Sequence, residues 1–428
     1  MADAPPPASP ILPASLWQQL SSRELKHLGS ALRHRDFRFF LGGAFLSNVG
    51  SWMQSVAQAW LVLHLTDSPF YLGLDAFANT LPLAAFSLLG GVAADRFDRK
   101  KLLLWTQWVM LFLALVQAVM TQVHLIRVWH VIFFSFCTGL TQAIAWPVYQ
   151  AVLANIVQRE HMSNAIALNS TQFNLARTLG PLLGAMGLSV FGTAGCFYAN
   201  AVSFVAVIAA LVRVHQPTNR RSPDSVETGV IASIREGFGY LATEKSLAWV
   251  LVTMAATTLL GIPLVTLLPV FARDILKVGA TGLGILVGAF GAGAVFSGIL
   301  VAFLGDFRGK GLFVMRSALL FVGAMIGFAV SLNMLVSVIC LFLAGFAMVG
   351  YASVINTMIQ SAVPDHLRGR AMSLFVFSFG GCMPFGNLMA GYLAHVFTAP
   401  RALLGQGLVL GCVVLYIFYV RTEVRLRV

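Results

Sequence analysis

Long apolar stretches separated by short polar breaks recur along most of the chain. Because a helix needs about 20 apolar residues to cross the hydrocarbon core of a bilayer, each stretch predicts one membrane-spanning helix. Six are expected in the first half, near residues 38–65, 71–94, 101–124, 128–154, 163–190 and 194–213. Six more are expected in the second half, near residues 247–272, 281–304, 311–332, 334–361, 370–395 and 402–420.

Polar stretches between these helices divide the chain into parts. Residues 214–246 form the longest internal break, and their polar, proline-containing beginning predicts a cytoplasmic linker. The leading tail is expected to hold a short amphipathic helix, because its leucines recur at helical spacing. The predicted parts are a cytoplasmic N-terminal tail over 1–35, a six-helix bundle over 36–213, the linker over 214–246, a second six-helix bundle over 247–421 and a cytoplasmic tail over 422–428.

The two halves of the sequence repeat each other. Identical residues recur at an offset of 211 residues, and farther along at an offset of 206. The pairs include Gly73 and Gly284, Asp95 and Asp306, Gly139 and Gly345, and Gly180 and Gly386. The pattern predicts an all-α membrane protein with twelve transmembrane helices in two pseudo-symmetric six-helix bundles, a plan known from transporters.

Composition supports lipid as the main solvent of this chain. Hydrophobic residues make up 58% of it and the mean hydropathy is +0.82, more than a soluble protein of this length could bury. The net charge of +12 does not indicate nucleic acid, because the charges lie in short clusters between apolar runs. The five cysteines lie inside apolar runs without metal-ligand spacing. We therefore expect no cofactor, no metal and no nucleic-acid partner.

The distribution of Lys and Arg predicts the orientation in the membrane. Of the 28 such residues, 23 fall on one predicted face and only four, at positions 127, 273, 277 and 401, fall on the other. Cytoplasmic loops carry the excess of positive charge. Both termini are therefore expected in the cytoplasm.

A charged turn between the second and third predicted helices carries a family signature. It reads Gly91-x-x-x-Asp95-Arg96-x-Asp98-Arg99-Lys100 and resembles the signature turn of the major facilitator superfamily, with Asp98 standing where glycine is commoner. The resemblance covers about residues 33–421. Within the superfamily the chain resembles the drug-efflux and siderophore-export branch that includes the enterobactin exporter. The residues that carry this are Arg35-Asp36-Phe37-Arg38, Asn48-x-Gly50-Ser51-Trp52, Pro147 and Arg177-Thr178-Leu179-Gly180-Pro181-Leu182-Leu183-Gly184.

The resemblance implies that the charged turn is a conformational latch. In the family the aspartate at the position of Asp95 meets the N-terminus of the eleventh helix, here near Gly369 and Arg370, when the cytoplasmic side closes. A carboxylate is stabilised there by the helix dipole. We interpret Lys100 and Lys101 mainly as topology anchors. The expected latch residues are Gly91, Asp95, Arg96, Arg99, Asp306 and Arg308.

Gly180, Pro181 and Gly184 lie deep in the fifth predicted helix. Proline removes a backbone hydrogen bond and kinks a helix, while glycine permits close helix approach. In the family a Gly-Pro element at this place marks antiporters, which implies export. Plain helix packing is the alternative, and we favour export.

Two charged residues inside predicted spans, Arg177 and Asp75, are candidates for the transport pathway. Arg177 needs a wet cavity or partners, so it either attracts an anionic substrate group or proton site, or bonds to carbonyls near Pro181, and we weigh these equally. Asp75, one turn inside the second span, could carry a proton. We favour a simpler interpretation, a carboxylate in a water-filled vestibule, because Asp75 lies near the interface and its repeat counterpart is Leu286.

Uncharged polar residues on several spans suggest a polar cavity with aromatic walls, although each is more often a helix–helix hydrogen bond. With Asp75 and Arg177, the candidates for the substrate or proton pathway are Gln54, Gln58, Gln142, Tyr149, Gln150 and Asn356. Nothing in the sequence indicates an enzyme. Gly305-x-x-x-Gly309-Lys310 is one residue short of a P-loop and lacks its Ser or Thr.

These observations favour a monomeric secondary transporter of a bacterial cytoplasmic (inner) membrane. We expect it to export amphipathic small molecules of the drug or siderophore class, with proton antiport and rocking of the two bundles. The alternatives are a gradient-independent facilitator or importer of the same fold, or a non-transporting membrane sensor.

Overall fold

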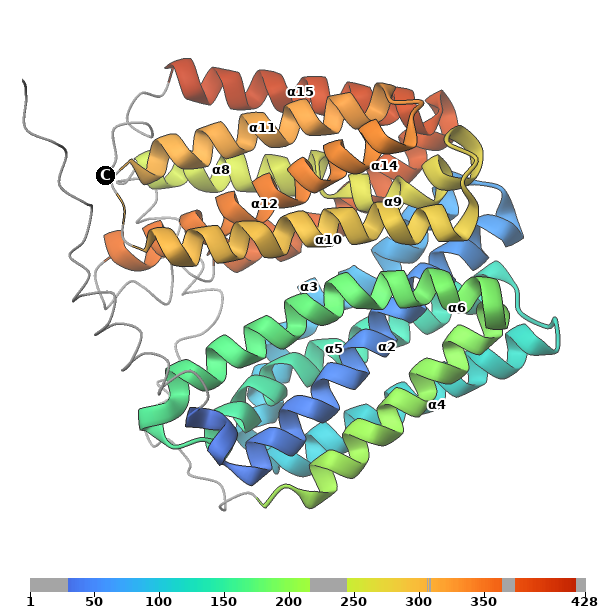
Figure 1. The fold of residues 1–428 in the computed structure, drawn as a ribbon, viewed down its shortest axis with the longest axis vertical. Helices are drawn as coiled ribbons and strands as arrows, with labels where there is room; N and C mark the ends of the chain where they lie inside the picture. Colours follow the sequence, from blue (N-terminus) through green and yellow to red (C-terminus); the bar gives the residue numbers. More distant parts are fainter. Residues whose placement is uncertain (1–29, 216–244, 306, 308, 364–373, 421–428) are drawn as a thin grey trace, which may run out of the picture.

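Long helices lie side by side in two bundles in the computed structural model, which describes residues 30–215, 245–305, 307, 309–363 and 374–420. In Figure 1 the helices of the first half, from α2 to α6, form the lower bundle, and those of the second half form the upper one. The described part is helical throughout apart from short connections. The predicted all-α fold is confirmed.

The first bundle contains the six predicted spans of the first half. They are α2 (Arg35–Thr66), α3 (Pro69–Arg96), α4 (Arg99–Gln122), α5 (Val128–Ile156) and the long α6 (Met162–Arg213), with short 3-10 turns at Ser30–Arg33 and Arg159–His161. Two spans are joined within α6 at Gly192, whose φ of 66° and ψ of −174° lie outside the helical region. Such a positive φ favours glycine, which has no Cβ.

The second bundle contains the other six spans. They are α8 (Lys245–Leu260) with α9 (Pro263–Val270) and the π-turn η3 (Phe271–Ile275), α10 (Gly279–Leu304), α11 (Lys310–Val330), α12 (Met334–Ala362), the π-turn η4 (Phe377–Gly381) with α14 (Met383–Phe397), and α15 (Ala399–Val420). Asn333 begins α12 as its N-cap, and its side chain accepts a hydrogen bond from the backbone N–H of Leu335 at 2.8 Å. This cap provides the boundary between spans nine and ten.

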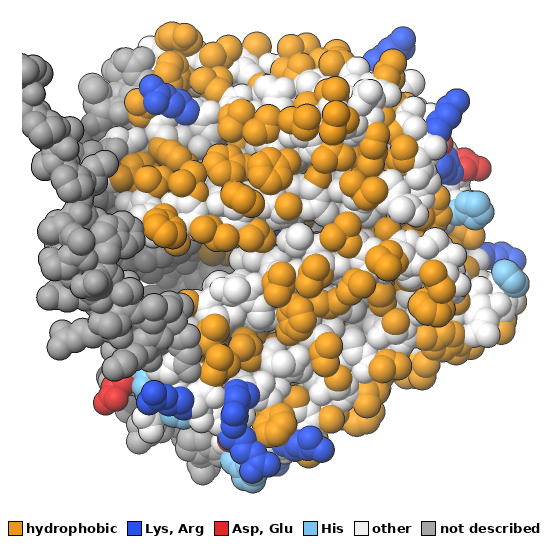
Figure 2. Space-filling model, viewed as in Figure 1, with side chains coloured by type: hydrophobic (Ala, Val, Ile, Leu, Met, Phe, Trp, Pro, Cys, Tyr) orange, Lys and Arg blue, Asp and Glu red, His pale blue; other side chains and the backbone are white. Residues whose placement is uncertain are grey.

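Surface polarity fits a membrane around the bundles. In the described part nine helices are long and apolar enough to cross a bilayer. The remaining long helices are α2 and α3, whose side chains Gln54, Gln58 and Asp75 lie within the bundle as described below. Figure 2 shows hydrophobic side chains over the middle of the molecule and charged ones toward its two ends, as expected for a multi-pass membrane protein.

Contacts between helices follow the sequence repeat. A Cβ at Gly139 on α5 would meet the carbonyl of Asn79 on α3, and one at the repeat partner Gly345 would meet the carbonyl of Phe290. Asn79 and Phe290 are separated by 211 residues, as Gly73 and Gly284 are, and Gly139 and Gly345 by the second offset of 206. The two bundles therefore use the same helix crossing.

The bundles share a core at one end of the molecule. One apolar cluster combines side chains of both halves, such as Leu63 on α2 and Leu267 on α9. Two further clusters lie at the opposite end, one in each half. We call the end where α2 meets α3 the closed end, and the opposite end, where α3 meets α4 around Arg99, the basic end. Figure 2 shows the surface hollowed between the two halves next to the basic end.

We predict that Gly139→Ala lowers the melting temperature of the purified protein by several degrees. The added methyl group would press on the backbone of α3, and overpacking of this kind costs about 1–3 kcal/mol. Gly42→Ala on α2 is the matched control, because no atom lies within 4 Å of its added Cβ. Equal melting temperatures for the two variants would contradict the predicted crossing.

Candidate functional site

The predicted latch lies at the basic end. Gly91 and Arg96 lie on the last turns of α3, where Arg96 is exposed and a Cβ at Gly91 would meet no atom within 4 Å. Arg99 donates from Nε to the carbonyl of Ala94 at 3.1 Å. The side chain of Asp95, and all of Asp306 and Arg308, lie outside the described residues. The latch therefore stays a prediction.

Two other residues of the charged turn fasten helix ends. Asp98 accepts a hydrogen bond from the backbone N–H of Lys101 at 2.8 Å and so caps α4, which explains an acidic residue where the family signature favours glycine. Lys100 donates from Nζ to the carbonyls of Val212 and Val214, at 3.2 Å and 2.6 Å. A cation at the C-terminus of α6 stabilises the helix, because it lies next to the negative end of the helix dipole.

A chain of buried polar side chains crosses the first bundle. Gln58 donates from Nε2 to both carboxylate oxygens of Asp75, at 3.2 Å and 2.9 Å, and to Oγ of Ser135 at 2.7 Å. The hydroxyl of Ser135 donates to Oδ1 of Asp75. Gln117 on α4 donates to Oε1 of Gln58 at 3.1 Å. Side chains of four helices therefore join in one network, in which α2 and α5 bond directly to the carboxylate on α3 and α4 bonds to Gln58.

The chain continues on the other side of Gln117. Gln54 on α2 donates to Oε1 of Gln117 at 3.2 Å, and Asn200 on α6 donates to Oε1 of Gln54 at 2.6 Å. Ser203 donates to Oδ1 of Asn200 at 2.9 Å. Asn200 and Gln117 are buried, with 3% and 1% of their surface exposed. Both side chains form hydrogen bonds within this row of polar residues, as buried polar groups generally do.

The interpretation of Asp75 as a vestibule carboxylate is wrong. Only 8% of Asp75 is exposed, and its oxygens are held by Gln58 and Ser135. The interpretation failed because depth along α3 says nothing about the sides of the helix, which are covered here by α2 and α5.

The other pathway candidates lie in separate places. Tyr149 donates to Asn169 on α6 at 2.5 Å and stacks on Phe40, with ring centres 4.8 Å apart, so it fastens α5 to α6 and α2. Gln142 is half-buried and Gln150 exposed on α5. Asn356 on α12 accepts a hydrogen bond from Gln360 within its own helix, at 2.5 Å. The structure brings only Gln54, Gln58 and Asp75 of the candidates into one network.

Arg177 lies where the two halves meet. Its guanidinium carbon is 5.7 Å from the ring centre of Trp52 on α2 and 5.8 Å from that of Phe290 on α10. Such cation–π contacts contribute about 0.5–2 kcal/mol. Among the described residues no carboxylate pairs with this guanidinium and no carbonyl accepts from it. The expected alternative, bonding to carbonyls near Pro181, is therefore not observed there.

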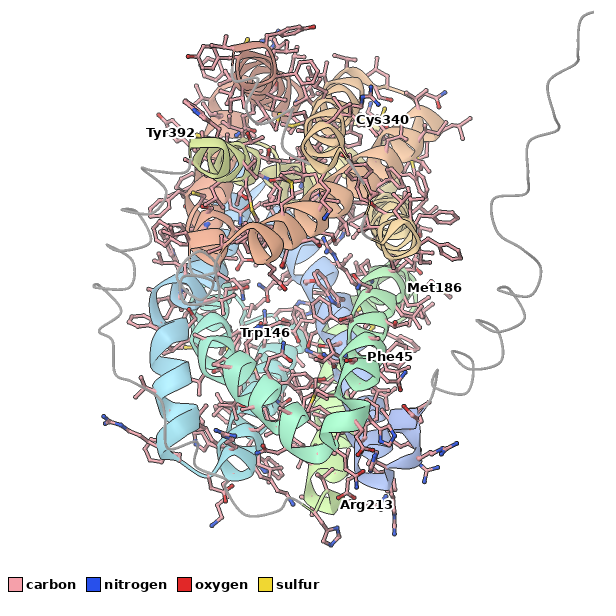
Figure 3. All side chains as sticks on the ribbon, turned by 90° about the vertical axis from the view of Figure 1, so that its left-hand side faces the viewer. Phe45, Trp146, Met186, Arg213, Cys340 and Tyr392 are labelled. Carbon is pink, nitrogen blue, oxygen red and sulfur yellow. The ribbon has the colours of Figure 1, made fainter. Side chains whose placement is uncertain are left out.

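Aromatic rings extend from Arg177 to the space between the bundles. Phe173 on α6 packs edge-on against Trp52, with ring centres 6.4 Å apart, and against Trp146 on α5, at 5.9 Å. Trp146 is 50% exposed, and Figure 3, which looks onto the basic end, places it between the bundles. A cation bordered by aromatic faces suits a ligand that is both anionic and apolar.

Gly180 and Gly184 bring α6 onto α2. A Cβ at Gly184 would lie 2.9 Å from the carbonyl of Met53, and one at Gly180 the same distance from that of Val49. The dihedral angles stay helical through Pro181, and Gly192 is the residue of α6 that leaves the helical region. This element holds Arg177, one turn away, against Trp52.

Comparison with known families identifies the chain. The family model described as "Transmembrane secretion effector" matches residues 29–426. The chain belongs to this family of the major facilitator superfamily. The resemblance found in the sequence is confirmed, and the protein is a membrane transporter, not an enzyme.

Curated relatives of this transporter are similar over most of their length. The staphyloferrin A transporter of Staphylococcus aureus is 22% identical over 91% of this chain and 97% of its own. Macrolide efflux protein A of Streptococcus pyogenes is 20% identical over 84% and 90%. The enterobactin exporter EntS of Shigella flexneri is 25% identical over 82% and 83%.

Solved structures share the fold of this transporter. A bacterial homologue of the human lysosomal transporter Spinster, solved inward-facing and unoccupied, matches with a TM-score of 0.73 at 12% identity, over 93% of this chain and 98% of its own. The likeness shows that the two-bundle major facilitator fold is the one adopted here.

A polar contact across the closed end escaped the sequence analysis. Arg273 on η3 donates from one terminal nitrogen to Oδ1 of Asp67 at 2.6 Å and to the carbonyl of Leu63 at 3.0 Å, both on the first half. Ser68 lies 3.2 Å from Nδ1 of His395 on α14. Arg273 and Asp67 are 206 residues apart, and no local pattern marks them as partners. Gln117, Ser135 and Asn200 escaped for the same reason, since a lone polar residue in a span does not show which helix it faces.

We predict that Arg273→Ala speeds amide hydrogen exchange at residues 63–67 about five-fold, since the lost contacts are worth about 1 kcal/mol. The side chain of Asp67 is 81% exposed, so solvent screening keeps this effect modest. Arg401→Ala, an exposed arginine at the start of α15, is the matched control. Equal exchange in the two variants would show that Arg273 does not hold the closed end.

Proposed function

We propose that this transporter exports amphipathic small molecules of the siderophore or drug class from the cytoplasm. It does so in exchange for protons, by alternating between the state described above and one that opens at the other end. The site that carries this proposal is Arg177 with its aromatic neighbours, on the wall between the halves. A substrate held there touches both bundles and so senses their relative position.

The direction of transport rests on charge and on α6. Most Lys and Arg residues lie in the breaks of one face, which favours a cytoplasmic basic end, so the hollow would receive substrate from the cytoplasm. The Gly180-Pro181 element, which marks antiporters within the superfamily, supports export. The relatives named for staphyloferrin A, enterobactin and macrolides support the substrate class.

Arg177 would bind an anionic group of the substrate. Its guanidinium offers five N–H donors in a fixed fork that suits carboxylates and similar anions. Trp52, Phe173 and Trp146 would hold the apolar part by stacking. Such a site binds a substrate with both features more tightly than one with either alone.

Export is tested first by comparing the metabolites secreted by cells with and without the transporter, by mass spectrometry. We expect an anionic amphipathic compound to be depleted from the medium of cells that lack it. That compound should accumulate in everted membrane vesicles that are acid inside, and a protonophore should abolish the accumulation. Uptake that survives the protonophore would instead support a gradient-independent facilitator.

We predict that Arg177→Gln lowers the apparent affinity for that compound about 10- to 100-fold in the same vesicles. A hydrogen bond between charged groups contributes about 1.5–3 kcal/mol, and each 1.4 kcal/mol is about ten-fold. Arg177→Lys should restore part of the affinity, because it keeps the charge but loses the fork. Arg316→Gln, an exposed arginine on α11, is the matched control. Unchanged affinity in Arg177→Gln would exclude Arg177 from the substrate site.

A further inference from the structure

The carboxylate of Asp75 is buried among neutral partners. Its hydrogen-bond partners are an amide and a hydroxyl, Gln58 and Ser135, and among the described residues no ion pair includes it. A buried carboxylate without a counter-charge is costly and marks a functional site in a membrane protein. Asp75 is not part of the proposed substrate site formed by Arg177 and its aromatic neighbours.

All the hydrogen bonds in this row of polar side chains have the same donor-to-acceptor direction, and Asp75 determines it. An ionised carboxylate can only accept hydrogen bonds, so Gln58 must present its N–H groups to Asp75. The carbonyl oxygen of Gln58 is then left to accept from Gln117, and the same alternation passes to Gln54 and Asn200. Every amide in the chain therefore donates toward Asp75.

The chemistry around Asp75 selects a proton over a metal ion. A metal needs several oxygen ligands pointing inward, whereas Gln58 and Ser135 present N–H and O–H donors. Within the described residues no group of three or more His, Cys, Asp or Glu is placed to hold a metal. A proton needs only the carboxylate oxygens.

Asp75 also lies beside the contact that must open during transport. Two residues away, Gly73 packs against α14, where its added Cβ would be 2.8 Å from the Cα of Gly391. The repeat places the partner contact between Gly284 on α10 and Ala185 on α6. A charge change at Asp75 therefore occurs next to the closed end of the interface.

We infer that Asp75 is the proton-binding site of this transporter and that the Gln58–Gln117–Gln54–Asn200 chain reports its protonation to α6. The inference deepens the proton-coupled export proposed above by naming the proton carrier. Protonated Asp75 gains an O–H donor, so the side-chain amide of Gln58 can reverse and accept from it. The side-chain amides of Gln117 and Gln54 then exchange donor and acceptor roles in turn. The last amide to do so is that of Asn200, which lies beside Gly50 of α2.

Apart from Cys137, the other titratable groups named here on the elements around α3 hydrogen-bond elsewhere or lie toward the helix ends. At the start of α2 and of α4 they are Arg35, Asp36, Arg38, Arg99, Lys100 and Lys101. Toward the closed end they are His64 on α2, its C-cap Asp67, His130 on α5, Arg273 on η3 and His395 on α14. Cys137 lies within α5, two residues from Ser135, and its thiol is a neutral neighbour of the site. In the hydrogen bonds of the described part, Asp67 pairs with Arg273, His130 accepts from the backbone of Arg127 and His395 contacts Ser68. None of these contacts includes Asp75.

The test is an infrared pH titration of the full-length protein in lipid nanodiscs without substrate. We expect a carboxylic-acid C=O band that appears on acidification and is lost in Asp75→Asn. If Asp75→Asn does not fold, Asp75→Glu should shift the frequency and the midpoint of that band. Ser135→Ala removes a donor to the ionised carboxylate and should move the midpoint up by about one pH unit or more, since such a bond is worth about 1.5–3 kcal/mol.

Matched controls separate Asp75 from general effects. Asp98→Asn removes a carboxylate at the basic end and should keep the band. Thr141→Ala removes a hydroxyl of the same helix as Ser135, one that donates to the carbonyl of Cys137, and should leave the midpoint unchanged. Gln117→Leu should keep the band but abolish any pH-dependent change in hydrogen exchange around Asn200.

A band that persists in Asp75→Asn, or that shifts equally in Thr141→Ala, would overturn the proton site. Hydrogen exchange around Asn200 that still follows pH in Gln117→Leu would overturn the reporting chain. Because no substrate is present, these outcomes differ from a failure of export. A transporter with no proton-driven export could still show the Asp75 band, and one with export could lack it.

Discussion

Close backbone contact between the two bundles at one end is the constraint on which the rest of the structure depends. Gly73 on Gly391, and Gly284 on Ala185, leave no room for a side chain, so the helices meet at backbone distance. Without a hydrophobic force between helices in lipid, such close packing supplies the attraction. Three features follow from this contact at the closed end. They are the hollow next to the basic end, the position of Arg177 between α2 and α10, and the hydrogen bond from Arg273 to the carbonyl of Leu63.

The two bundles share a helix crossing but differ in chemistry. The first bundle contains the polar chain that ends at Asp75, whereas the repeat position of Asp75 in the second bundle is Leu286, which is fully buried. The buried polar atoms without a partner among the described residues belong to Ser297 and Gln406, both in the second bundle. The buried polar network with its carboxylate therefore belongs to the first bundle, and the corresponding position of the second bundle is apolar. Phe290 joins the two halves at Arg177, since its ring borders this arginine from the second bundle.

Helices and repeat could be predicted because they depend on local or periodic signals. A span needs about 20 apolar residues, and this signal located all twelve spans, including those that meet inside α6 at Gly192. The surroundings of Asp75 could not be predicted in this way. Its distance from the helix end suggested a wet site, but Gln58 and Ser135 cover it from α2 and α5. Arg177 was recognised as exceptional, yet its aromatic neighbours come from three different helices, which periodicity along α6 cannot reveal.

By itself the sequence determined that the protein lies in a membrane, how many spans it has, that its halves repeat, and its family. Each of these follows from hydropathy, from residue spacing or from a contiguous motif. Only the tertiary structure decided which polar residues face each other, which end is closed, and which of the candidates form one network. The physical reason is that a polar side chain in lipid must find its partner on another helix. Partners such as Gln54 and Asn200 are 146 residues apart, and only the packing of the helices brings them together.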